Sequence, residues 1–253
     1  MGFALTDPFM WLLGAIVVAA VLYSSVGHGG ASGYIAMMAL FGLSAQDMKA
    51  AALVMNIFVA SLVFARLYRA GHFNVRLFVP LALTSVPMAY LGGAYVIDEP
   101  TYKYVVGAVL LVAAARLLID SGDRPATATP TLWIALPVGA AIGFLAGLTG
   151  VGGGIFLSPL LLFLCWTNMR TNAAIAAAFI LANSIAGLLG YMTVATGWPT
   201  GLPALVVAAL VGGVIGSELA TRRVAPANLR KLLGVVLVIA GVKMFMTAQA
   251  VIT

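Results

Sequence analysis

Apolar runs of nearly membrane-spanning length follow one another along this chain, with little polar sequence between them. A helix needs roughly 20 apolar residues to cross the hydrocarbon core of a bilayer, and about 17 to 25 are tolerated. The runs cover approximately residues 9–26, 29–43, 48–66, 76–97, 102–119, 132–149, 153–167, 172–194, 202–218 and 229–249. Only 8% of the residues are charged, against about 25% in a soluble domain, whose surface must be hydrated. The pattern predicts an all-α, polytopic integral membrane protein.

Two of these runs, 29–43 and 153–167, are too short to cross a bilayer comfortably. Each follows a cluster of glycines. The clusters are Gly27-His28-Gly29-Gly30 and Gly150-Val151-Gly152-Gly153-Gly154. Because each glycine destabilises a helix by about 1 kcal/mol relative to alanine, such clusters indicate breaks. We therefore expect 9–43 and 132–167 to form helical hairpins or broken helices that turn within the membrane.

The chain divides into two related halves, residues 1–125 and 126–253. The two glycine clusters are 123 residues apart, and Asn56 aligns with Asn183 at a similar offset. The stretch 66–76 holds three arginines, whereas its counterpart in the second half has no charge. Since basic loops face the cytoplasm, the second half must be inverted relative to the first. The sequence predicts two inverted repeats, each a glycine-broken hairpin plus three transmembrane helices, with both termini external.

Inversion brings the two breaks together near the middle of the membrane, where each is followed by a helix N-terminus. Two converging N-termini form an anion site without a buried lysine, because each carries about half a positive charge and unpaired N–H groups. The predicted substrate-binding residues are Gly27, His28, Gly29, Gly30, Ser32, Gly150, Gly152, Gly153, Gly154, Asn56 and Asn183. His28 is also the predicted proton carrier, because an imidazole titrates near neutral pH.

Structural roles are the alternatives for several of these residues. His28 would then be a neutral histidine bonded to a carbonyl, the asparagines would tie helices together, and Ser32 would cap a helix. Close helix packing is the expected role of Gly92, Gly93, Gly212, Gly213 and Gly216. Lys49 and Arg170 open the spans after the two hairpins. They either attract an anion or extend to the membrane surface, and we expect the second role.

The two glycine segments resemble the TauE/SafE family of sulfite and organosulfonate exporters. The matching segments are Ser25-Val26-Gly27-His28-Gly29-Gly30-Ala31-Ser32-Gly33 and Gly147-Leu148-Thr149-Gly150-Val151-Gly152-Gly153-Gly154-Ile155-Phe156-Leu157-Ser158-Pro159. The two related halves and Arg230-Lys231-Leu232-Leu233-Gly234 also fit the family. His28 stands where a small or aliphatic residue is common, and Ala31 replaces a glycine. The resemblance implies proton-coupled export of a small anion, such as sulfite or sulfoacetate, across the inner (plasma) membrane.

One alternative function fits the sequence equally well, and two others fit it less well. A small-anion uptake permease has the same pattern, an intramembrane enzyme needs paired catalytic groups that no span contains, and a channel needs a charged ring or filter repeat. The net charge of +6 lies between apolar runs, which excludes a nucleic-acid partner. Cys165 is the one cysteine, and we expect no cofactor and no metal. The expected partners are a small anion, protons and the lipid bilayer, and homo-oligomerisation stays open.

Overall fold

The chain folds into a bundle of helices, as the apolar runs predict. The computed structural model describes residues 7–25, 30–118, 131–195, 197–221 and 227–252. Within these residues the first half contains α1 (Asp7–Ser25), α2 (Ala31–Leu40), α3 (Ala45–Arg69), α4 (Val75–Ala94) and α5 (Glu99–Leu118). The second half contains α6 (Leu132–Thr149), α7 (Gly154–Phe163), α8 (Met169–Met192), α9 (Leu202–Thr221) and α10 (Ala227–Ile252). Each predicted run corresponds to one helix, so the predicted polytopic helical fold is confirmed.

The two short runs form the two short helices. The helices α2 and α7 have 10 residues each, or about 15 Å at 1.5 Å per residue, half the hydrocarbon thickness of a bilayer. The helices α3, α4, α6 and α8 are each long and apolar enough to cross a membrane. The sequence order of one long helix, one short helix and three long helices occurs in both halves.

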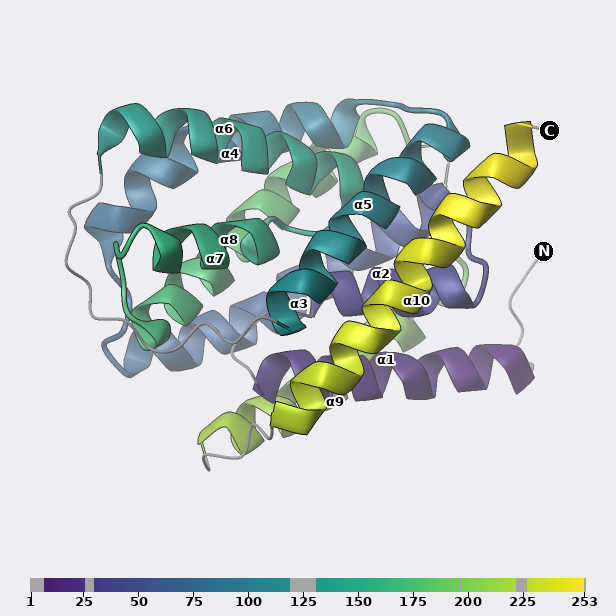
Figure 1. The fold of residues 1–253 in the computed structure, drawn as a ribbon, viewed down its shortest axis with the longest axis horizontal. Coiled ribbons are helices and arrows are strands. Elements are labelled where there is room, and N and C mark those ends of the chain that lie inside the picture. The colour runs from purple at the N-terminus through teal and green to yellow at the C-terminus, as the bar shows by residue number, and fades with distance from the viewer. Residues whose placement is uncertain (1–6, 26–29, 119–130, 196, 222–226, 253) are drawn as a thin grey trace.

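The long helices of one half pack mainly against those of the other. The pairs α4–α6, α1–α9, α5–α10 and α3–α8 are all contacts between the halves. Figure 1 shows α1 starting and α2 ending at one end of the molecule, whereas α6 starts and α7 ends at the opposite end. We call the first end, which holds residues 40–45 and 94–99, the Ser44 end. The second, which holds residues 69–75 and 163–169, is the Arg69 end.

Glycines allow these helices to approach closely, as predicted for the glycine pairs of α4 and α9. At Gly92, Gly93, Gly212 and Gly216, an added Cβ would overlap a backbone carbonyl oxygen of a neighbouring helix. Gly213 is less crowded, because the nearest atom to its added Cβ is a side-chain carbon at 3.2 Å. The backbones are therefore in contact at four of the five predicted positions, which is how small residues bring membrane helices together.

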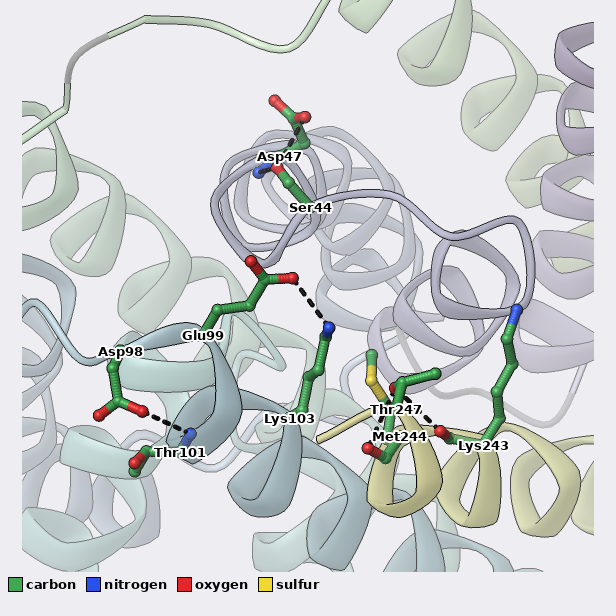
Figure 2. Close-up of polar contacts among 9 residues, drawn as sticks. All are labelled: Ser44, Asp47, Asp98, Glu99, Thr101, Lys103, Lys243, Met244 and Thr247. Atoms are coloured by element: carbon green, nitrogen blue, oxygen red, sulfur yellow. Dashed lines mark hydrogen bonds and ion pairs between the residues drawn. The ribbon is translucent and has the colours of Figure 1, made fainter. Parts of the chain in front are cut away.

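Polar side chains order the helix termini at the Ser44 end (Figure 2). The Ser44 hydroxyl caps α3 by accepting a hydrogen bond from the backbone N–H of Asp47 at 3.1 Å. On the first turn of α5, Lys103 pairs with Glu99 at 2.9 Å. Lys243 of α10 donates to the carbonyl oxygen of Leu40, the last residue of α2, at 2.6 Å. The short helix α2 therefore ends against a lysine of another helix, which satisfies one of its free carbonyl groups.

Candidate functional site

The second glycine break separates α6 from α7. Gly150 directly follows α6, and Gly153 directly precedes α7. The φ values of Gly150, Gly152 and Gly153 are +82°, +76° and +82°. This left-handed backbone costs an L-amino acid with a side chain roughly 1–2 kcal/mol, whereas glycine adopts it freely. The glycines are therefore required by the backbone of the break itself.

The first break is described from Gly30 onward; Gly27, His28 and Gly29 lie outside the described residues. Gly30 precedes α2 with a φ of +40°, and the ring of Tyr34 lies where a Cβ on Gly30 would project. The buried Tyr34 hydroxyl has no hydrogen-bond partner among the described residues. Across the break, the Tyr23 hydroxyl of α1 and the Ser32 hydroxyl of α2 are 2.6 Å apart. Ser32 therefore links the two arms of the hairpin.

Both breaks line one small cavity. Its walls include Gly30 and Ser32 from the first break and Val151 and Ile155 from the second. The volume, about 20 Å³, is enough for about one water molecule. An oxyanion with four or more heavy atoms does not fit in this volume.

The helix that follows each break begins without a side-chain cap. Gly30 precedes α2 and Gly153 precedes α7, and neither position supplies a side-chain hydrogen bond. By contrast, α3 and α8 are capped by the side chains of Ser44 and Asn168. The first residues of both helices line the cavity, Ala31 and Ser32 from α2 and Ile155 from α7. A helix N-terminus carries a partial positive charge.

Polar side chains of α3 and α8 surround Gly152. A Cβ on Gly152 would lie 3.1 Å from the Ser184 hydroxyl and 3.3 Å from the Asn56 amide nitrogen. That nitrogen donates to the carbonyl oxygen of Gly150 at 3.0 Å. The Asn56 carbonyl oxygen and the Ser184 hydroxyl are buried without a hydrogen-bond partner in the described part of the chain. Buried polar groups left unpaired destabilise a protein by about 1–3 kcal/mol each, so a ligand that pairs them is favoured.

The other predicted residues point elsewhere. Gly154 faces the side chain of Ile180, and an added Cβ on Gly153 would face Ile142, Phe179 and Ala146. Asn183 accepts a hydrogen bond from the Ser85 hydroxyl of α4 at 2.9 Å. The structure thus joins Gly30, Ser32, Gly150, Gly152 and Asn56 around the breaks and pairs Asn183 with α4. Sequence analysis missed Ser184, because a single serine in an apolar helix carries no signal of its surroundings.

The expectation for Lys49 was wrong. Its side chain does not extend to the membrane surface but is 7% exposed. The ammonium donates to the carbonyl oxygens of Gly93, Gly92 and Tyr95 at 2.8, 3.2 and 3.4 Å. These carbonyls end α4, where no further helical N–H is available, so the lysine takes the place of those donors. Arg170 at the start of α8 is exposed, as expected.

The described residues contain no group of three or more His, Cys, Asp or Glu side chains that could hold a metal ion. The polar groups at the breaks are hydroxyls, amides and backbone N–H groups, which bind anions by hydrogen bonding.

Comparisons with known proteins place the chain among membrane transporters. The family model described as "Sulfite exporter TauE/SafE" matches residues 12–244. The probable membrane transporter protein y4hK of Sinorhizobium fredii is 37% identical over 235 residues, which are 91% of this chain and 95% of the relative. The probable membrane transporter protein YjnA of Bacillus subtilis is 26% identical over 92% of this chain and 97% of its own. No solved structure matches the chain significantly.

Proposed function

The chain belongs to the sulfite exporter TauE/SafE family of membrane transporters, and we propose that it exports a small sulfur-containing anion across the inner membrane. The anion is sulfite or an organosulfonate, and it is held between the two glycine breaks. The observation that carries this proposal is the cavity where two helix N-termini without side-chain caps meet. The unpaired hydroxyl of Ser184 and carbonyl of Asn56 beside Gly152 add hydrogen-bonding capacity.

We further propose that residues 1–125 and 126–253 are inverted repeats that alternate access to this site. Two observations support the proposal. The helix order is repeated in the two halves, and the long helices of one half pack mainly against those of the other. The cavity is too small for such an anion, so the breaks must move apart before an anion enters. Relative movement of the two repeats provides that opening, as in other transporters built from inverted repeats.

The proposed orientation places the Ser44 end outside and the Arg69 end in the cytoplasm. The C-terminus of α3 and the N-termini of α4 and α8 lie at the Arg69 end (Figure 1). These termini carry Arg66, Arg69, Arg76 and Arg170, which fits the excess of basic residues on the cytoplasmic side. A periplasm-dependent reporter such as alkaline phosphatase should be active when fused after residue 253. The same reporter fused after Gly71 should be inactive. A cytoplasmic reporter result at residue 253 contradicts the orientation.

Transport itself is tested with the purified protein in liposomes. Vesicles loaded with sulfite, sulfoacetate or methanesulfonate should lose at least one of these anions at least tenfold faster than protein-free vesicles. A proton gradient should alter the rate, and the anion should be recovered chemically unchanged, which separates transport from catalysis. The proposal fails if no sulfur anion crosses faster than in the protein-free control under either gradient. If the anion moves only in the direction that corresponds to entry into the cell, the result supports the uptake alternative.

His28 is the proposed proton carrier, on the basis of its position in the first glycine cluster. In the same vesicles, His28→Gln retains a hydrogen-bonding side chain and removes the titratable group. The variant should flatten the dependence of transport on pH between about pH 5 and 8. A wild-type pH profile in the variant assigns proton coupling to another group and leaves the anion proposal intact.

A further inference from the structure

A second, larger cavity opens at the Ser44 end. Its volume is about 350 Å³, within the range of small-molecule sites. The walls come from the start of α3, the segment after α4, the first turn of α5 and the end of α8. Lys49, Tyr102, Tyr191, Val194 and Glu99 are among the residues that line it.

The buried Lys49 ammonium has no carboxylate within 4 Å in the described part of the chain. The ion pairs found there are Arg66 with Glu218 and Lys103 with Glu99. Glu99 also lines the cavity, but its carboxylate is 2.9 Å from the Lys103 ammonium, as Figure 2 shows. The partners of Lys49 are three neutral carbonyls and the ring of Tyr191, whose centroid is 5.9 Å from the ammonium. A buried cation with neutral partners only is stabilised by a nearby anion.

Two residues that line this cavity also contact the second glycine break. The backbone oxygen of Lys49 lies 3.0 Å from the position of a Cβ built on Gly150. The Tyr102 hydroxyl donates to the carbonyl oxygen of Thr149 at 2.9 Å. Lys49 and Tyr102 therefore contact the break on one side and the cavity on the other.

We propose that this cavity is a second anion site, a vestibule in which a small water-soluble oxyanion pairs with Lys49 next to the second glycine break. The inference rests on the proposed function, because the vestibule serves the anion that passes between the breaks. Its walls of tyrosine, valine and isoleucine also suit an anion with a short apolar tail. The site therefore fits an organic sulfonate or carboxylate.

The charge of the vestibule is measured with a reporter thiol. Val194→Cys places the thiol on the vestibule wall, and Cys165→Ser removes the native thiol. The rate at which the Val194→Cys thiol reacts with the anionic reagent sulfonatoethyl methanethiosulfonate is compared with its rate of reaction with the cationic trimethylammonioethyl reagent. Both rates are measured in a neutral detergent. Lys49→Gln should lower the anionic-to-cationic rate ratio by about fivefold to tenfold, because a full charge in the cavity that the thiol also lines is removed. Lys49→Arg should preserve the ratio. An unchanged ratio in folded Lys49→Gln overturns the proposal and leaves Lys49 as a cap of α4.

A second measurement requires no change at Lys49. Methanesulfonate at millimolar concentration should slow modification of the Val194→Cys thiol in a saturable way, whereas the neutral isostere dimethyl sulfone should not. Equal effects of the two compounds overturn the proposal. Adding Gly152→Leu should stop transport but leave this protection, which separates the vestibule from the site between the breaks. If protection occurs while no sulfur anion crosses the vesicles, the proposed function fails and the vestibule stands.

Discussion

Gly152→Leu should reduce transport by at least 100-fold while the protein still inserts into the membrane. Two effects combine at this position. The φ of +76° disfavours any side chain, and an added Cβ lies 2.8 Å from Ile180 and 3.1 Å from the Ser184 hydroxyl. The larger leucine side chain would therefore extend toward Asn56, Ser184 and Ile180, and Ile180 lines the cavity that we assign to the anion. Initial transport rates in proteoliposomes, at matched protein incorporation, measure the effect.

Gly42 provides a matched control for backbone strain. Its φ is +77°, and nothing lies within 4 Å of an added Cβ. Gly42→Leu therefore has the same unfavourable backbone conformation as Gly152→Leu but does not enter the break. Transport should fall by less than about threefold in Gly42→Leu. If Gly152→Leu transports with unchanged apparent affinity, the glycines of the second break have a structural role only.

Much of the fold could be predicted because bilayer thickness limits helix length. Each apolar run forms one helix, and the two runs that are too short to cross a bilayer form α2 and α7. The glycine breaks were also predictable, since clustered glycines weaken a helix wherever it lies. The role of Gly92 and Gly93 followed from their occurrence as a small pair within an apolar run. These features depend on local sequence, so a single chain contains enough information.

The polar contacts depended on distant segments and could not be predicted. Lys49 binds carbonyls at the end of α4, more than 40 positions along the chain, and carbonyls leave no signal in a sequence. Asn56 and Asn183 look equivalent, yet one binds the second break and the other accepts from Ser85. Similarly, the sequence does not show that a side chain on Gly152 would point toward Ser184 and Asn56. Nor does it show that a side chain on Gly153 would point toward Ile142 and Phe179. Directions and partners of this kind are set by tertiary packing.

The largest expected loss of stability comes from Gly147→Leu in α6. An added Cβ on Gly147 would overlap the carbonyl oxygen of Ala89 and lie 2.8 Å from the backbone nitrogen of Gly93. Both atoms belong to the backbone of α4, which cannot rotate away as a side chain would. The helices must then separate, and they form one of the main contacts between the two halves. Overpacking of this kind costs about 3 kcal/mol or more when the backbone has to move.

Thermal unfolding of the detergent-solubilised protein tests this expectation. At about 2–4 °C per kcal/mol for a chain of this size, Gly147→Leu should lower the apparent Tm by about 6–12 °C. Gly14→Leu is the matched control, because Gly14 is exposed on α1 and nothing lies within 4 Å of its added Cβ. That variant should unfold within about 2 °C of the wild type. Equal Tm values for Gly147→Leu and Gly14→Leu would mean that α4 and α6 do not meet backbone to backbone. The glycines of α6 would then have no role in holding the two halves together.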